Sequence, residues 1–170
     1  MRADIKVWNP ENPAQWNKTL AWTTVWLSTF SLTLGFCAWF LVPSLAPRLN
    51  EIGFQLDHRQ LYWLVAMVGL SAGTLRIIWT FLPPILGTRI LVTFSTALLL
   101  IPLFCWVYAV MNPGTPYWVL LLFSLFSGIG GGTFSGLMAS TNYYFPKKQR
   151  GFALGVQGGL SDFGTGLVQF

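Results

Sequence analysis

The chain has 170 residues, of which 54% are hydrophobic and only 9% are charged. An ordinary soluble domain carries about 25% charged residues, so this composition excludes most classes of soluble protein. The net charge of +5 would suggest nucleic acid as a partner of a soluble protein. In a membrane protein it is explained by topology, so we expect a lipid bilayer and no nucleic acid as partner.

Residues 1–18 form a polar leader with the sequence MRADIKVWNPENPAQWNK. It combines prolines, mixed charges and two tryptophans, Trp8 and Trp16, which suit a segment at a membrane surface. It lacks the short apolar core of a signal peptide. We therefore expect a cytoplasmic or interfacial leader, followed by a first apolar segment that is kept as a membrane span.

Residues 19–170 are expected to form a transmembrane domain. A helix needs about 20 apolar residues to cross a bilayer core, and the chain has no charged residue over 19–47 or 90–146. The predicted spans are approximately 20–47, 61–86, 90–110, 116–145 and 152–170. The predicted fold class is all-α, a polytopic transmembrane bundle of about five helices. The last span stops at Phe170 without a polar flank, so we expect a truncated chain.

Basic residues are concentrated on one side of this predicted bundle. Seven lysines and arginines lie in the leader and in the segments after the second and fourth spans, whereas the opposite loops contain only Arg48 and Arg59. Cytoplasmic loops carry an excess of positive charge. This pattern predicts a multi-pass protein of the cell (inner) membrane with a cytoplasmic N-terminus.

Two charged residues, Arg76 and Asp162, interrupt apolar spans. Each lies ten residues from the cytoplasmic end of its span, a depth of about 15 Å. Charges at this depth are costly and are functional candidates by default. Arginine suits the capture of an oxyanion because its guanidinium stays protonated and offers paired donors. The alternative is an ion pair between Arg76 and Asp162 that only locks two helices.

Glycines recur every four residues in two consecutive rows. Gly128, Gly132 and Gly136 form the first row, and Gly151, Gly155 and Gly159 form the second, with Gly158 and Gly164 nearby. Small residues on one face let membrane helices pack closely. Packing is the simpler explanation of any single pair, and two rows further suggest helices that shift against their neighbours.

Phe134 lies inside the first glycine row, roughly 16 Å from the cytoplasmic end of its span. It is therefore level with the two charges. We expect it either to stack on a flat ligand or to have a plain packing role.

The sequence contains no pattern typical of an enzyme or of a metal site. Cys37 and Cys105 lie in apolar runs, and the single histidine, His58, lies in a polar loop. We found no histidine pair, no serine with a base and no phosphate-binding loop. The prediction is therefore a protein that is not an enzyme and that has no metal or cofactor.

Several segments resemble the nitrate/nitrite porter family of the major facilitator superfamily. They are the leader WNPENPAQW, the second-span segment GTLRIIWTFLPPILGTR, the glycine row GIGGGTFSG, the linker YYFPKKQRG, and ALGVQGGLSDFGTG, which is similar to the nitrate signature of the family. The resemblance covers nearly the whole chain. The last three segments occur in the family's order and spacing.

The resemblance implies roles for individual residues. The substrate-binding arginine of the second span matches Arg76, and the aromatic residue that stacks on the planar anion matches Phe134. The signature glycines match Gly155, Gly158, Gly159 and Gly164, and Gly158 is a candidate substrate contact. The family has twelve spans in two halves with a second substrate arginine in the eighth, so this chain would be most of the N-terminal half. Its C-terminal half would then be the missing partner.

The chain departs from the family pattern at four positions. Thr133 replaces an asparagine of the fourth span, and Gln157, Ser161 and Asp162 change the signature. An ionised carboxylate at the pocket wall would repel an anion. Either Asp162 pairs with Arg76, or it is kept protonated by desolvation, or the substrate differs from nitrate.

These observations predict a secondary active transporter that moves nitrate, nitrite or both by alternating access. Transport would be nitrate/nitrite exchange or proton-coupled nitrate uptake, and in the second case Asp162 is the candidate proton carrier. The alternatives are a major facilitator transporter of another small anion, or a non-transporting membrane subunit in which the glycines and the two charges serve assembly.

Overall fold

The computed structural model describes residues 8–13 and 15–169. The start of the predicted leader, with Arg2 and Lys6, lies outside these residues, as does Phe170. Every regular element in the described part of the chain is a helix. The predicted all-α class is therefore confirmed.

The first helix, α1, spans Lys18–Leu45 and continues through the 3-10 turn η1 (Ala46–Arg48) into the short helix α2 (Leu49–Ile52). It begins where the side chain of Asn17 accepts a hydrogen bond from the backbone N–H of Leu20, which satisfies one of the free donors at a helix start. Helix α2 ends at Gly53, whose φ of 118° is a conformation that glycine adopts at low cost.

The next three helices form a helical hairpin, in which α3 is the first arm and α4 with α5 is the second. Helix α3 (His58–Leu86) begins with a capping box made by Asp57 and Gln60, and it turns at Gly87 into α4 (Thr88–Leu98). Helix α5 (Leu100–Met111) continues α4 after a break at Leu99. The chain then enters α6 (Tyr117–Tyr144), which is followed by α7 (Lys147–Ser161) and α8 (Phe163–Leu167).

Four helical segments within the described residues are long and apolar enough to cross a membrane. They are Lys18–Ile52, His58–Leu86, Thr88–Met111 and Tyr117–Tyr144. Helices α7 and α8 are not among them, so the fifth span and the predicted span limits stay predictions. Many large apolar side chains on these helices face outward, among them Phe30 and Phe104, each 67% exposed.

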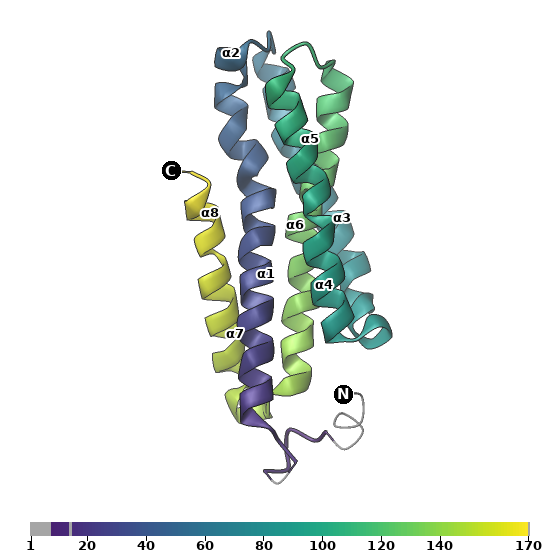
Figure 1. Ribbon diagram of the computed structural model, residues 1–170, viewed down its shortest axis with the longest axis vertical. Coiled ribbons are helices and arrows are strands. Elements are labelled where there is room, and N and C mark those ends of the chain that lie inside the picture. The colour runs from purple at the N-terminus through teal and green to yellow at the C-terminus, as the bar shows by residue number, and fades with distance from the viewer. Residues whose placement is uncertain (1–7, 14, 170) are drawn as a thin grey trace.

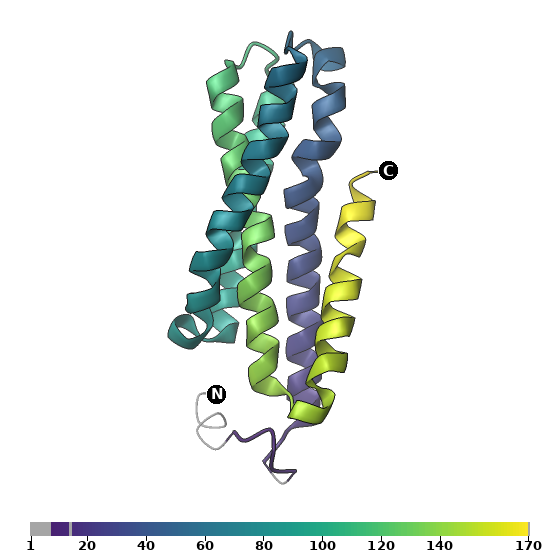
Figure 2. The ribbon, with the colours of Figure 1, turned by 180° about the vertical axis from the view of Figure 1, so that it is seen from behind.

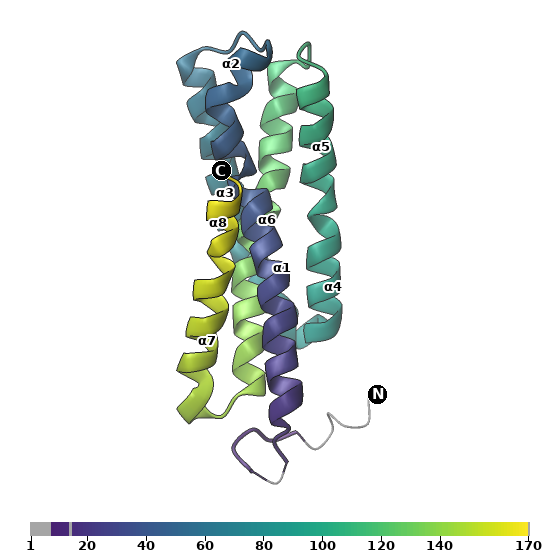
Figure 3. The ribbon, with the colours of Figure 1, turned by 60° about the vertical axis from the view of Figure 1, so that its left-hand side comes forward.

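Helix α6 lies at the centre of the bundle, packed against α3 on one side and α1 on the other (Figure 1). The view from behind shows α3 and α6 crossing at close range (Figure 2). Helices α7 and α8 run along α1, and the turned view places them on the side of α1 away from α4 and α5 (Figure 3). This arrangement brings one face of each of α1, α3 and α6 together.

Candidate functional site

The first glycine row lets α6 lie almost in backbone contact with α3. A Cβ atom added at Gly132 would lie 2.7 Å from the Cβ of Leu75, and one added at Gly136 would lie 2.8 Å from the carbonyl oxygen of Trp79. Both distances are too short for a real Cβ contact. Only glycine at these positions allows α3 to approach this closely.

Two further glycines of the same segment face α1. A Cβ atom at Gly131 would lie 2.8 Å from the indole ring of Trp39, and one at Gly130 would meet the carbonyl oxygen of Gly35. Helix α6 therefore lies between α1 and α3 and packs closely against both. As a result, Trp39 from α1 and Arg76 from α3 reach the same point on α6.

The Arg76 guanidinium is held by one hydrogen bond and two aromatic rings. Its Nε donates to the carbonyl oxygen of Gly131 over 3.1 Å. Its Cζ atom lies 5.2 Å from the ring centroid of Trp39 and 5.4 Å from that of Phe134. A cation within about 6 Å of a ring centroid is attracted by the ring's quadrupole. The three contacts fix the orientation of a side chain that is otherwise long and mobile.

Neighbouring groups hold this arrangement in place. Phe36 packs against both rings, with centroid distances of 5.7 Å to Trp39 and 5.9 Å to Phe134. The hydroxyl of Ser135 donates to the carbonyl oxygen of Arg76 over 2.8 Å and so ties α6 to α3 at this level. The site therefore combines rigid aromatic walls with a fixed cation.

Donors of Arg76 remain free for a ligand. Within the described residues, its two Nη atoms have no hydrogen-bond partner, and no carboxylate forms an ion pair with it. A guanidinium is always protonated in proteins, and its fork of N–H groups matches two oxygens of one planar oxyanion. The half-buried Arg76 is thus a positive charge that lacks a counter-ion from the described chain.

Trp39 was missed by the sequence analysis. It lies in the middle of an uncharged run, away from the span ends where tryptophans are usually found. The available signal was its position four residues after Gly35, which places the two on one helix face. Phe134 and Arg76, by contrast, were both predicted, and the structure brings them together.

Asp162 contributes no hydrogen bond or ion pair to this cluster within the described residues. It is exposed at the junction of α7 and α8, and its backbone oxygen accepts a hydrogen bond from the hydroxyl of Thr165. Both helices pack along α1, and no ion pair joins Asp162 to Arg76 in the described part of the chain. The alternative of a helix-locking ion pair is therefore not formed here. The substrate-binding roles of Asp162 and Gly158 stay predictions.

The second glycine row differs from the first in its surroundings. A Cβ atom at Gly151, Gly155 or Gly159 would meet nothing within 4 Å among the described residues. Gly158 lies beside Met138, and Gly164 packs against the Thr33 carbonyl on α1. The structure thus gives Gly164 a close helix contact, whereas the second row lies on an open face.

Two of the residues that depart from the family pattern make buried internal hydrogen bonds. Thr133 donates to the carbonyl oxygen of Gly130 over 2.8 Å. The fully buried Gln157 of α7 accepts from Thr141 over 2.6 Å and donates to Ser28 over 3.0 Å. Gln157 therefore ties α7 to both α6 and α1.

Within residues 8–13 and 15–169, no group of three or more histidine, cysteine or acidic residues is placed to hold a metal ion. Cys37 and Cys105 are free thiols.

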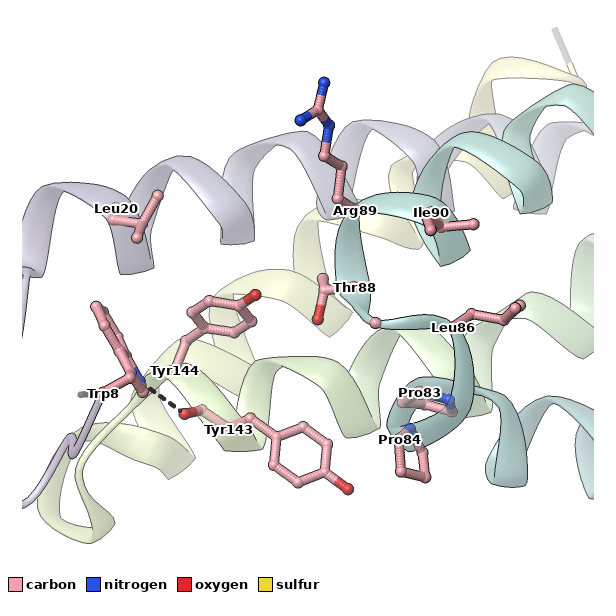
Figure 4. Close-up of a pocket in the computed structure, with 11 residues that line it drawn as sticks. Trp8, Leu20, Pro83, Pro84, Leu86, Thr88, Arg89, Ile90, Tyr143 and Tyr144 are labelled. Atoms are coloured by element: carbon pink, nitrogen blue, oxygen red, sulfur yellow. Dashed lines mark hydrogen bonds between the residues drawn. The ribbon is translucent and has the colours of Figure 1, made fainter. Parts of the chain in front are cut away.

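A hollow of about 770 Å³ lies away from Arg76, between the leader, the α3–α4 turn and the end of α6 (Figure 4). Trp8, Pro83, Pro84 and Tyr143 are among the residues that line it. Arg89 is also at its edge, but its guanidinium points away from the other lining residues. Among the described residues that line the hollow, none therefore directs a positive charge into it.

Comparison with known proteins agrees with this architecture. A model of the Major Facilitator Superfamily matches residues 10–168, so the chain belongs to this superfamily and is a multi-pass membrane protein.

Relatives within the superfamily are named for nitrate and nitrite. The Probable nitrate/nitrite antiporter NarK2 of Thermus thermophilus is 62% identical over 98% of this chain and 38% of its own length. The Nitrate/nitrite transporter NarU of Escherichia coli (strain K12) is 38% identical over 97% of this chain and 36% of its own length. The Nitrate/nitrite transporter NarU of Salmonella typhimurium is 39% identical over 95% of this chain and 36% of its own length. The predicted family resemblance is confirmed, and the chain spans less than two fifths of the length of these relatives.

Proposed function

We propose that this chain is the N-terminal part of a secondary transporter that moves nitrate and nitrite across the cell (inner) membrane by alternating access. The observation that carries the proposal is the Arg76 guanidinium, fixed between Trp39 and Phe134 with its Nη donors unpaired among the described residues. The names of the relatives support the choice of anion.

The chemistry of the cluster suits a small planar anion. Nitrate and nitrite are flat, singly charged oxyanions, and a guanidinium can donate to two of their oxygens at once. Aromatic rings beside the cation exclude water, which strengthens charge-assisted hydrogen bonds. Tetrahedral anions such as sulfate and phosphate are thicker and more strongly hydrated, so a guanidinium flanked by two aromatic rings would disfavour them.

The rest of the pocket would come from the C-terminal half of the complete protein. Secondary transporters bind substrate near the bilayer midplane at the interface between two repeats, which rock about the bound substrate. In this proposal the basic leader and helix ends face the cytoplasm. Transport would be by nitrate/nitrite exchange or by proton-coupled nitrate uptake.

The test is exchange in liposomes that contain the complete purified protein. Liposomes loaded with nitrite should take up external ¹⁵N-nitrate, and excess external nitrite should compete with it, whereas equal concentrations of sulfate or phosphate should not. Empty liposomes are the control. Uptake that does not depend on the protein, or equal competition by sulfate, would refute the proposed substrate class.

A further inference from the structure

The leader makes specific contacts with the corner where α6 ends and α7 begins. Within residues 8–16, three side chains, Trp8, Glu11 and Trp16, reach this corner although they precede it by more than 120 residues in sequence. We call residues 8–16 the leader strap, of which Ala14 is not described.

The strap supplies hydrogen bonds to the end of α6. The last carbonyl groups of a helix have no partner within the helix. The indole N–H of Trp8 donates to the carbonyl oxygen of Tyr143 over 3.1 Å (Figure 4), and that of Trp16 donates to the carbonyl oxygen of Tyr144 over 2.9 Å. Two free acceptors of α6 are thereby satisfied.

The strap also caps the start of α7. The N-cap residue of α7 is Pro146, which makes no side-chain capping bond. The carboxylate of Glu11 instead accepts a hydrogen bond from the backbone N–H of Lys147 over 2.9 Å. A carboxylate at a helix N-terminus is favoured both by the free N–H groups and by the helix dipole. Glu11 thus takes the place of a local N-cap.

Aromatic packing anchors the strap at the same corner. Trp8 packs edge-on against Tyr144, with 5.7 Å between ring centroids, and Trp16 packs against the fully buried Phe145 at 6.2 Å. Trp8 also lines the hollow shown in Figure 4. The leader is therefore packed onto the helix bundle at this end.

We infer that the leader strap fixes the α6–α7 corner and that Glu11 is a positioning residue for α7. Helix α7 has an open face along Gly151, Gly155 and Gly159, so its placement depends on its contacts with α1 and α6, including those of Gln157, and on this corner. Because α7 carries Gly158 and leads to Asp162, the strap helps to set the position of both residues. The part of this inference that concerns transport rests on the proposed function.

Hydrogen exchange in the complete protein tests the cap directly. In Glu11→Ala, backbone amides of residues 147–150 should exchange roughly fivefold faster, as expected when a helix cap is lost. Glu11→Gln keeps an oxygen acceptor and should remain within about twofold of the wild type. Glu51→Ala removes another exposed acidic residue, on α2, and is the matched control. Unchanged hydrogen exchange in Glu11→Ala, or equally faster hydrogen exchange in Glu11→Gln, would contradict the capping of α7 by Glu11.

Transport by the same variants tests the positioning role. Glu11→Ala should lower the maximal rate of nitrate exchange more than it changes the KM, because Glu11 lies at the helix corner and not beside Arg76. Glu11→Gln should restore the rate. Faster hydrogen exchange with unchanged transport would overturn the positioning role. If the wild type moves no nitrate, the proposed function fails. The hydrogen exchange of residues 147–150 still tests whether Glu11 caps α7.

Discussion

Arg76 on α3 and Trp39 on α1 form a cation–π pair, with 5.2 Å between the guanidinium carbon and the indole centroid. Their helices can meet because the glycines of α6 leave room for both. The close packing of α1 and α3 on α6 thus places the Trp39 ring beside the Arg76 guanidinium. A change at either residue should alter anion binding, and a change at Trp39 also removes a partly buried side chain that packs against the hydrophobic core.

Trp39→Ala tests the contribution of this ring. A cation–π contact contributes about 0.5–2 kcal/mol, so the KM for nitrate should rise roughly two- to thirtyfold. Trp39→Phe keeps a ring and should have a smaller effect. Trp26→Ala removes a tryptophan of the same helix that is 54% exposed, and it should leave the KM unchanged. An equal KM in Trp39→Ala and the wild type would show that the ring does not support Arg76.

Gly132→Ala tests the close approach of α3 and α6. The added methyl group would lie 2.7 Å from the Cβ of Leu75, and overpacking of this kind costs about 1–3 kcal/mol. The melting temperature of the complete protein in detergent should therefore fall by several degrees. Gly73→Ala on α3 is the matched control, since a Cβ there meets nothing within 4 Å in the described structure. A stable Gly132→Ala protein with unchanged transport would contradict this packing.

Gln157→Leu tests the buried hydrogen bonds between α7, α6 and α1. The leucine would remove the acceptor used by Thr141 and the donor to Ser28. Leaving a buried polar group unpaired costs about 1–3 kcal/mol, so thermal stability should decrease. Gln149→Leu changes an exposed glutamine in the first turn of the same helix and should have little effect. Equal melting temperatures for the two variants would refute a role for Gln157 in holding α7.

Asp162→Asn separates exchange from proton coupling. Asp162 is exposed and forms no ion pair with Arg76 among the described residues, so simple nitrate/nitrite exchange predicts the same pH profile of uptake in the variant and the wild type. Uptake is measured at several pH values with no imposed proton gradient and then with one. A pH dependence that is lost only in Asp162→Asn would instead establish the proton-coupled mechanism.

The sequence was sufficient to predict the helical class, the superfamily and the shared depth of Arg76 and Phe134. The class follows from long uncharged runs and the shared depth from distances along the predicted spans, whereas the superfamily was predicted from motifs that resemble the nitrate/nitrite porter family. The contact of Trp39 with Arg76 could not be predicted in this way, because it depends on how α1 crosses α6. The open face of Gly155 and Gly159 was also not predictable, since spacing identifies a helix face but not its neighbour.

The contacts of the leader were likewise not predictable from the sequence. Its composition indicated a segment at the membrane surface. Its hydrogen bonds to Tyr143, Tyr144 and Lys147 depend on three-dimensional proximity between the leader and the corner where α6 ends and α7 begins. Sequence periodicity contains no information about such a contact.

The most direct test of the central claim is nitrate exchange by Arg76→Lys in liposomes that contain the complete protein. Lysine keeps the charge but loses the planar fork of donors, so we predict normal expression and a KM for nitrate at least about tenfold higher. Arg89→Lys, at an exposed arginine, should transport like the wild type. Unchanged nitrate KM in Arg76→Lys would contradict the assignment of Arg76 as the anion-binding group.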